Sequence, residues 1–131
     1  MNIKSSQTLV EEAQKNIETL SSTEVKTLYD NKEITLIDVR DIREIWKEGT
    51  IENSKHIPRG MLEFWLDPQS TYYQFKNKEI KKIVLFCALG WRSALATKSL
   101  QDMGFTNVAH VDGGFEALKK SGLKVIAKEK K

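Results

Sequence analysis

The sequence predicts an α/β fold in which helices cover both faces of a central parallel sheet. The stretches 35–39 and 82–87 are short, apolar and rich in β-branched residues without polar alternation, which is typical of strands buried on both faces. Segments with helical spacing of apolar residues alternate with these strands along the chain. Because 131 residues support one hydrophobic core, we expect a single domain.

Two helices are expected before the first strand. Val10, Ala13 and Ile17 are spaced by three and by four residues, as on one face of a helix, and predict a helix over 8–16. Ser21 has a glutamate three residues later and therefore forms the pattern of a capping box. A second short helix is expected to start there and to end before the strand.

The second half of the chain is expected to continue the alternation. Apolar residues at helical spacing follow the strand 82–87 as far as Gly104, which suits a left-handed helix end. Residues 107–111 predict another strand, and a turn of aspartate and two glycines leads into a last helix over 115–120. The polar and aromatic connection 59–79 gives no clear prediction.

Composition argues against a nucleic-acid surface. The net charge is +3, and the body of the chain is close to neutral because the last four residues carry +2 of it. We expect residues 1–16 to be an N-terminal helical extension, 17–122 the folded domain, and 123–131 a lysine-rich, solvated tail.

The single cysteine limits the chemistry further. It excludes an intramolecular disulfide and a thiolate-rich zinc site, so we expect no structural metal. The first residues lack the apolar segment of a secretory signal, and the longest apolar run is far shorter than the roughly 20 residues that span a bilayer. We expect no membrane contact and a cytoplasmic protein, although a chain whose signal peptide had been removed would look the same.

Cys87 ends the second buried strand, at the edge of the sheet where α/β folds bind ligands. In the following loop Gly90 tolerates a positive φ, and we expect Ser93 to begin the next helix, so that successive backbone N–H groups point inward. The helix N-terminus and the charge of Arg92 favour a thiolate there. A lone cysteine is more often a small buried apolar residue, but this context favours a nucleophile.

Six fragments in order resemble the rhodanese-like sulfurtransferase domains, from about residue 17 to residue 122. Each fragment alone is weak evidence, but a cysteine loop at a strand end, an Asp-x-Arg strand end and a Gly-Gly turn make a specific combination. The fragments are LIDVR (36–40) followed by Glu44, EGTI (48–51), HIPRGMLEFW (56–65), FCALGWRS (86–93), MGFTNV (103–108) and DGGF (112–115).

The resemblance implies that sulfur moves through a persulfide on Cys87. The donor would be a small anion such as thiosulfate, or a persulfide, and the acceptor a thiol or cyanide, with no metal or organic cofactor. The loop would hold the persulfide and the donor through Ala88, Leu89, Gly90, Trp91, Arg92 and Ser93. Asp38, Arg40 and Glu44 match positions that support the loop and the strand ends.

Other residues near these motifs are expected to be structural. His56 and His110 are interpreted as satisfied structural histidines, because a thiolate formed by its surroundings needs no base. Phe64 and Trp65 are expected in the core, whereas Trp91 suits the rim of the site. Two residues depart from the pattern: Thr50, where the family generally has histidine, does not carry the sulfur, and Phe115, in place of a frequent tryptophan, is expected to change only packing.

Two other classes of function stay open. Cysteine phosphatases and arsenate reductases share this scaffold, but their loop is one residue longer than the six residues from Cys87 through Arg92. A wider ring of N–H groups suits a tetrahedral oxyanion, so the shorter loop favours sulfur. The second alternative is a sulfur-relay or regulatory protein-binding module; the presence of the cysteine argues against a purely regulatory one.

Overall fold

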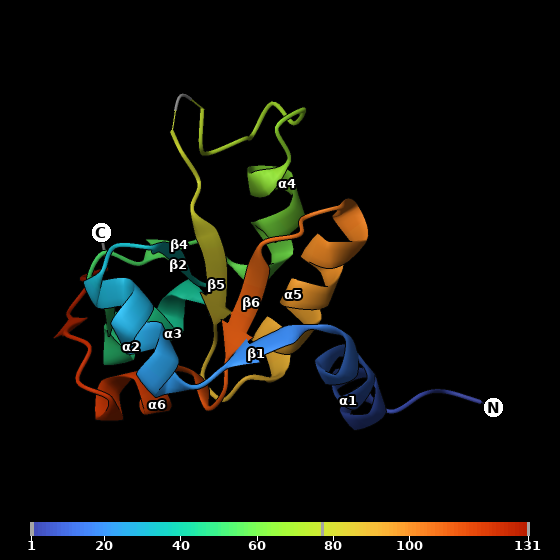
Figure 1. Ribbon diagram of the computed structural model, residues 1–131, viewed down its shortest axis with the longest axis horizontal. Helices are drawn as coiled ribbons and strands as arrows, with labels where there is room; N and C mark the ends of the chain where they lie inside the picture. Colours follow the sequence, from blue (N-terminus) through green and yellow to red (C-terminus); the bar gives the residue numbers. More distant parts are fainter. Residues whose placement is uncertain (1, 77, 131) are drawn as a thin grey trace.

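The computed structural model describes residues 2–76 and 78–130. A five-stranded sheet, in which every neighbouring pair is parallel, forms its centre (Figure 1). In spatial order the strands are β1 (Glu18–Leu20), β6 (Val108–Val111), β5 (Lys82–Phe86), β2 (Ile34–Asp38) and β4 (Lys55–His56). A separate antiparallel pair joins β3 (Thr50–Ile51) to β7 (Val125–Ile126).

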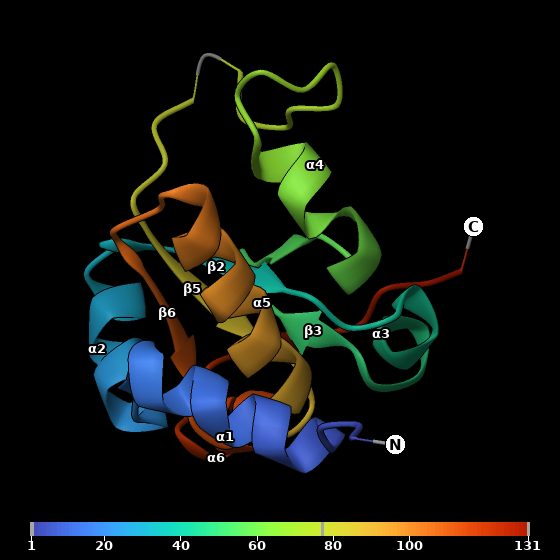
Figure 2. The same ribbon diagram turned by 90° about the vertical axis from the view of Figure 1, so that its right-hand side faces the viewer.

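Helices cover both faces of the sheet, which confirms the predicted fold class (Figure 1). One face carries α4 (Leu62–Leu66), preceded by the 3₁₀ turn η1 (Arg59–Met61), and α5 (Trp91–Met103). The other face carries α2 (Ser22–Asp30) and α6 (Gly114–Lys120). The helix α1 (Ser6–Asn16) lies across α5 as an outer layer (Figure 2), and α3 (Ile42–Glu48) follows β2.

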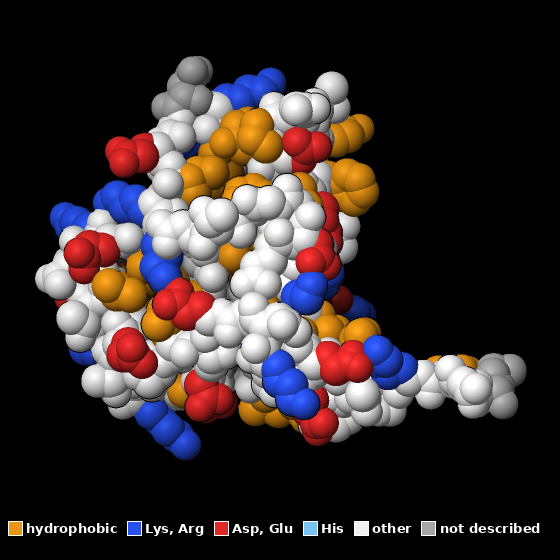
Figure 3. All heavy atoms as spheres, turned by 45° about the vertical axis from the view of Figure 1, so that its right-hand side comes forward, with side chains coloured by type: hydrophobic (Ala, Val, Ile, Leu, Met, Phe, Trp, Pro, Cys, Tyr) orange, Lys and Arg blue, Asp and Glu red, His pale blue; other side chains and the backbone are white. Residues whose placement is uncertain are grey.

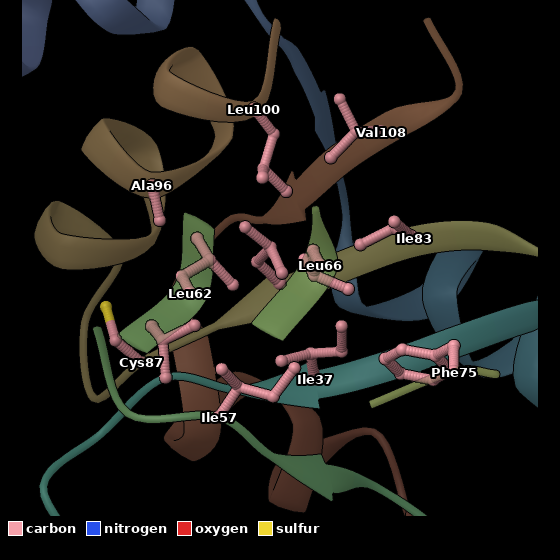
Figure 4. Packing of buried hydrophobic residues seen from close by; sticks show 12 residues of the cluster. Ile37, Ile57, Leu62, Leu66, Phe75, Ile83, Cys87, Ala96, Leu100 and Val108 are labelled. Carbon is pink, nitrogen blue, oxygen red and sulfur yellow. The ribbon is translucent and has the colours of Figure 1, made fainter. Parts of the chain in front are cut away.

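Side chains of the central strands divide between two apolar clusters. In β5, Ile83 and Leu85 point to the α4 and α5 side, where Figure 4 shows the packed cluster, whereas Val84 and Phe86 point to the α2 and α6 side. Cys87 continues the first of these rows. Because each strand contributes to both clusters, its sequence is apolar without alternation, as the two central strands predicted.

The longer elements agree with the sequence patterns to within one or two residues. The opening helix begins at Ser6, because the side chain of Ser5 caps it by accepting a hydrogen bond from the N–H of Thr8. Both hydrogen bonds of the capping box at Ser21 are present. The final helix begins one residue early, at Gly114.

Shorter elements have no counterpart among the predictions. The strands β1, β3, β4 and β7 are two or three residues long, too short to show a period. A capping box of Asp41 and Glu44 does mark the start of α3, so that helix had a readable signal. Within the connection 59–79, η1 and α4 form, and residue 77 lies outside the described residues.

The expectation that Phe64 is a core residue is wrong. Leu62 and Leu66, four residues apart on α4, are buried in the apolar cluster, and Phe64 lies between them on the exposed side of the helix. Trp65 packs against the cluster as a partly buried residue. On the face in Figure 3 basic and acidic side chains are interspersed, in keeping with a nearly neutral body.

Candidate active site at the end of strand β5

Cys87 lies at the carboxyl end of β5 and is 1% exposed. It belongs to the apolar cluster under α4 and α5, and Figure 4 shows it at the margin of that cluster with its sulfur directed away from the other labelled side chains. The residue is therefore buried, and only the groups that surround the sulfur distinguish a reactive thiol from a packed one.

Backbone amides of the loop do turn toward the sulfur. The N–H of Gly90 donates to Cys87 Sγ across 3.1 Å, and the N–H of Ser93 donates across 3.4 Å. Gly90 has a φ of 117°, a left-handed conformation that side chains rarely adopt, and it caps the start of α5. These donors form part of the bowl that the loop sequence predicts.

The helix α5 starts at Trp91, two residues earlier than expected. Ser93 is consequently in the first turn, where backbone N–H groups have no partner within the helix and remain free to bind the sulfur. Residues of the loop differ in exposure. Gly90 and Ser93 are buried, whereas Leu89 and Trp91 are 61% and 59% exposed. Trp91 thus has the rim position that its place in the loop suggests.

The Gly-Gly turn after β6 packs directly against the cysteine loop. The N–H of Phe115 donates to the carbonyl of Cys87 across 2.8 Å. A Cβ at Gly114 would lie 2.5 Å from that carbonyl oxygen and 2.4 Å from the carbonyl oxygen of Ala88. Only glycine allows this approach, so the second glycine of the turn positions the loop that carries the sulfur.

Arg92 is bound to Glu44 from the neighbouring helix α3. Its Nη1 and Nη2 donate to the two carboxylate oxygens across 2.6 and 3.0 Å. The hydrogen bonds from Arg92 lower the pKa of Glu44, and the same hydrogen bonds raise the pKa of Arg92. The structure therefore joins these two predicted site residues in a bidentate ion pair beside the loop, with the guanidinium partly exposed.

Asp38 and Arg40 form a fully buried pair at the end of β2. Arg40 donates through Nη2 to Asp38 Oδ2 across 2.8 Å and to the carbonyl of Gly49 across 2.7 Å. Thr50 donates its hydroxyl to Asp38 across 2.7 Å, and the guanidinium lies 4.1 Å from the ring centre of Phe115. The two departures from the family pattern thus both contact this pair.

Sequence reasoning missed a polar connection behind the sulfur. Ser93 Oγ lies 3.5 Å from Cys87 Sγ and 2.9 Å from Nδ1 of His110, whose Nε2 lies 3.1 Å from the hydroxyl of Thr19. Burial lowers the pKa of His110, partly offset by Asp112. A histidine in the otherwise apolar stretch VAHV was the available signal.

The surface has a hollow beside the cysteine loop and another that lies away from this loop. One of about 470 Å³ adjoins the loop and is lined by Asp41, Arg43, Glu44, Lys47 and Arg92. Another of about 440 Å³ lies under α3, with Trp46 and His56 among its lining residues. Cys87 lines neither of these two hollows, and Arg92 is the residue of its loop that borders the first one.

The part of the chain that the structure describes, residues 2–76 and 78–130, contains neither a metal site nor a membrane-spanning helix. No group of three or more His, Cys, Asp or Glu side chains there could hold a metal ion. Within the same ranges no helix is long and apolar enough to cross a membrane.

Comparison with known proteins identifies the family. A model of the rhodanese-like domain matches residues 21–121. The chain belongs to the rhodanese-like domain family. It is 34% identical over 98 residues to the mouse (Mus musculus) thiosulfate sulfurtransferase/rhodanese-like domain-containing protein 3, covering 71% of this chain and 62% of that protein. It is 36% identical to a tRNA uridine(34) hydroxylase of Prochlorococcus marinus, covering 66% of this chain and only 28% of the relative.

Two solved structures that each cover more than nine-tenths of this chain resemble it. A protein of unknown function from Rhodopseudomonas palustris, described as a possible tyrosine phosphatase, has a TM-score of 0.88 and 41% identity over 96% of this chain and 97% of its own. The polysulfide-sulfur transferase homodimer from Wolinella succinogenes has a TM-score of 0.71 and 33% identity, covering 92% of this chain and 85% of its own. Family and neighbours together support sulfur transfer in general.

Proposed function

We propose that this rhodanese-like domain is a sulfurtransferase that carries sulfane sulfur as a persulfide on Cys87. The observation that supports the proposal most is the pair of N–H groups, from Gly90 and Ser93, that donate to the only sulfhydryl of the chain. Preorganised amide donors stabilise negative charge that develops on the atom they face. The thiolate, which is the nucleophile of the first displacement, carries such charge on the atom that these donors face.

The reaction proceeds in two displacements. The Cys87 thiolate attacks the sulfane sulfur of an anionic donor such as thiosulfate, a new S–S bond forms, and sulfite leaves with the electron pair of the bond that breaks. The outer sulfur of the resulting persulfide is then attacked by a thiolate or cyanide, and Cys87 leaves as the thiolate. The cycle needs neither a second cysteine nor an added oxidant.

Residues around the loop receive supporting roles in this proposal. Ala88, Leu89, Gly90, Trp91 and Ser93 shape the bowl and its rim, and the partly exposed guanidinium of Arg92 attracts the anionic donor while Glu44 orients it. Asp38 and Arg40 hold the neighbouring strand end. A free cysteine and the absence of a second one suit a reducing compartment such as the cytoplasm.

A phosphatase is the alternative named by one structural neighbour. The loop from Cys87 through Arg92 has six residues, and the N–H groups of Gly90 and Ser93 are already directed at the sulfur itself. This arrangement favours a sulfur atom over a tetrahedral oxyanion. A relay role, in which donor and acceptor are proteins, uses the same persulfide and differs only in its partners.

Intact mass spectrometry tests the proposal directly. Wild-type protein incubated with thiosulfate is expected to gain the mass of one sulfur atom and to lose it on addition of cyanide, with thiocyanate released. Since Cys87 is the only cysteine, Cys87→Ser should gain no sulfur and lower turnover by at least about 1,000-fold. His56→Asn, which changes a residue outside the loop, serves as the control that should load normally.

Two results would contradict the assignment. A Cys87→Ser protein that still converts thiosulfate and cyanide to thiocyanate would remove the carrier. Wild-type protein that gains no sulfur but hydrolyses an aryl phosphate would establish the phosphatase instead.

A further inference from the structure

A chain of polar atoms leads from the buried sulfur of Cys87 through two buried residues to the exposed Thr19 on the edge strand β1. It runs from Cys87 Sγ to Ser93 Oγ over 3.5 Å, from there to His110 Nδ1 over 2.9 Å, and from His110 Nε2 to the hydroxyl of Thr19 over 3.1 Å. Its members come from the loop after β5, from α5, which carries Ser93, and from β6 and β1, which carry the other two. Such an arrangement requires the tertiary fold and has no local cause.

Strand register explains why His110 meets the site. Val108 packs in the cluster under α5, and His110, two residues on in β6, points to the same side of the sheet. His110 pairs with Leu85 on one side and with Thr19 on the other. At 1% exposure its ring fills a position that an apolar residue would fill more cheaply, and both ring nitrogens have partners.

Each hydroxyl and each ring nitrogen along this series of polar atoms can act either as a donor or as an acceptor. With a neutral thiol, Cys87 donates to Ser93, and Ser93 donates to His110 Nδ1. With a thiolate, the direction reverses, because His110 Nδ1–H donates to Ser93 and the Ser93 hydroxyl donates to the sulfur. Moving from the first state to the second takes one proton from the sulfur to the hydroxyl oxygen and one from that hydroxyl to the imidazole.

We propose that His110 is a positioning residue that receives the Cys87 proton through Ser93 and holds it as an imidazolium while the sulfur is anionic. The inference rests on the proposed function, which it deepens by naming where the proton of the thiol goes. The imidazolium then keeps the Ser93 hydroxyl aimed at the sulfur through both displacements, and no proton needs to leave the buried site.

Two effects act on the charge of His110 in opposite directions. Burial, the larger effect, lowers its pKa and disfavours the imidazolium, whereas Asp112, in the turn after β6, favours it. The other ionised groups on adjoining elements have partners of their own, since Glu18 on β1 pairs with Lys82 on β5, and Arg92 on α5 pairs with Glu44 on α3. The thiolate is therefore the anion to which the hydrogen bonds of His110 lead.

Protons and electrons balance throughout the cycle. Cys87 and neutral His110 become thiolate and imidazolium, and the thiolate then takes sulfur from thiosulfate with release of sulfite. The persulfide anion replaces the thiolate beside the same imidazolium. Transfer of the outer sulfur to cyanide yields thiocyanate and restores the thiolate, so that the proton stays on His110 until the thiol re-forms.

Alkylation of Cys87 by iodoacetamide as a function of pH tests this without relying on sulfur transfer. Near neutral pH, His110→Asn is expected to react about tenfold more slowly than wild type, a size that one charge-assisted hydrogen bond supports. Above about pH 9 the two rates should converge, because hydroxide then removes the thiol proton. His56→Asn is the matched control, expected to follow the wild-type profile.

Ser93→Ala provides a second variant that removes the connection and leaves the imidazole in place. It should change the pH profile as His110→Asn does, and the double variant should lose little more than either single one, because both residues act through one path. Superimposable profiles of His110→Asn and wild type, or a loss that is equal at all pH values and additive with Ser93→Ala, would overturn the proposal.

NMR titration of the His110 ring gives a readout independent of reactivity. In Cys87→Ser the anion that supports the imidazolium is absent, so the titration midpoint of His110 should fall relative to wild type. An unchanged midpoint would show that the ring does not sense the sulfur. Failure of the sulfur-loading experiment with these two results intact would reject the sulfurtransferase and leave the proton path standing.

Discussion

Two neighbouring strand ends of the same sheet bury polar groups in opposite ways. Asp38 at the end of β2 and Cys87 after β5 are adjacent, since β2 and β5 pair in parallel and the N–H of Val39 donates to the carbonyl of Phe86. Asp38 has an ionic partner, Arg40, fully enclosed with it. Cys87 has two N–H donors and one hydroxyl as partners, and among residues 2–76 and 78–130 no charged side chain is hydrogen-bonded to its sulfur.

Asp38 and Cys87 are both almost completely buried, so burial alone does not distinguish a structural polar group from a candidate reactive one. Every strong acceptor site at the β2 end is occupied by a partner from the chain, so the pair is closed. At the β5 end two N–H groups face the sulfur, and the proposed function requires this sulfur to form a bond. Glu44 links the two regions, because it caps α3 after β2 and holds Arg92 at the start of α5.

The largest expected effect is a double dissociation between the two strand ends. Arg40→Met leaves Asp38 buried without its counter-ion and should lower the free energy of unfolding by about 3–5 kcal/mol. Sulfur loading per folded molecule should persist. Cys87→Ser should do the reverse, with loading abolished and stability nearly unchanged. Urea unfolding and intact mass provide the two measurements.

Arg43→Met is the control for the Arg40 variant, because Arg43 forms an exposed ion pair with Asp41 and its loss should leave stability unchanged. An Arg40→Met protein as stable as wild type would show that the buried pair is no more structural than the exposed one, and the contrast between the strand ends would disappear.

A smaller, pH-dependent effect is expected for Glu44→Gln. The pKa of Glu44 is lowered by Arg92, so the ion pair stabilises the fold above the ordinary carboxyl value of 4.5 and is lost as the pH falls through the lower folded value. The variant should therefore be less stable than wild type at pH 7, by at most about 1 kcal/mol since the pair is partly exposed. Below about pH 4 the difference should shrink.

Urea midpoints at several pH values measure this difference, and thiosulfate kinetics on the same variant show whether releasing Arg92 alters the KM for the donor. A gap between Glu44→Gln and wild type that stays constant or widens on acidification would refute the assigned direction.

The smallest effect on stability is expected at the rim. Trp91 is 59% exposed, so Trp91→Ala should change the free energy of unfolding by less than about 0.5 kcal/mol. Cyanide should remain a good acceptor, whereas the KM for an aromatic thiol should rise because an apolar contact is removed. A matching rise for cyanide would place Trp91 in the bowl and not at its rim.

Local patterns of the sequence predict the elements that form from short-range interactions. The capping box at Ser21, the glycine that ends α5 and the two unalternating strands each depend on neighbours in the chain, and the structure has them where they are expected. The same is true of the positive φ at Gly90. Elements of two or three residues escape this reasoning because their strand partners lie far away in sequence.

The bowl around Cys87 could be read from one loop, but its connections could not. Glu44 was expected only to support the loop. In the structure both of its carboxylate oxygens accept hydrogen bonds from Arg92, 48 residues later in the sequence. His110 was interpreted as a structural histidine. Its contact with Ser93, on which the proposed proton path rests, depends on the register of β6 against β5.

The α/β class, the nucleophile candidate and the glycine that bends its loop could be predicted from local patterns. Each of them follows from apolar patterning and backbone sterics within a few residues. Only the tertiary structure decided which side chains meet at the sulfur. Parallel strands place residues from distant parts of the chain side by side, and the identity of those neighbours depends on strand order and register, which no local pattern encodes.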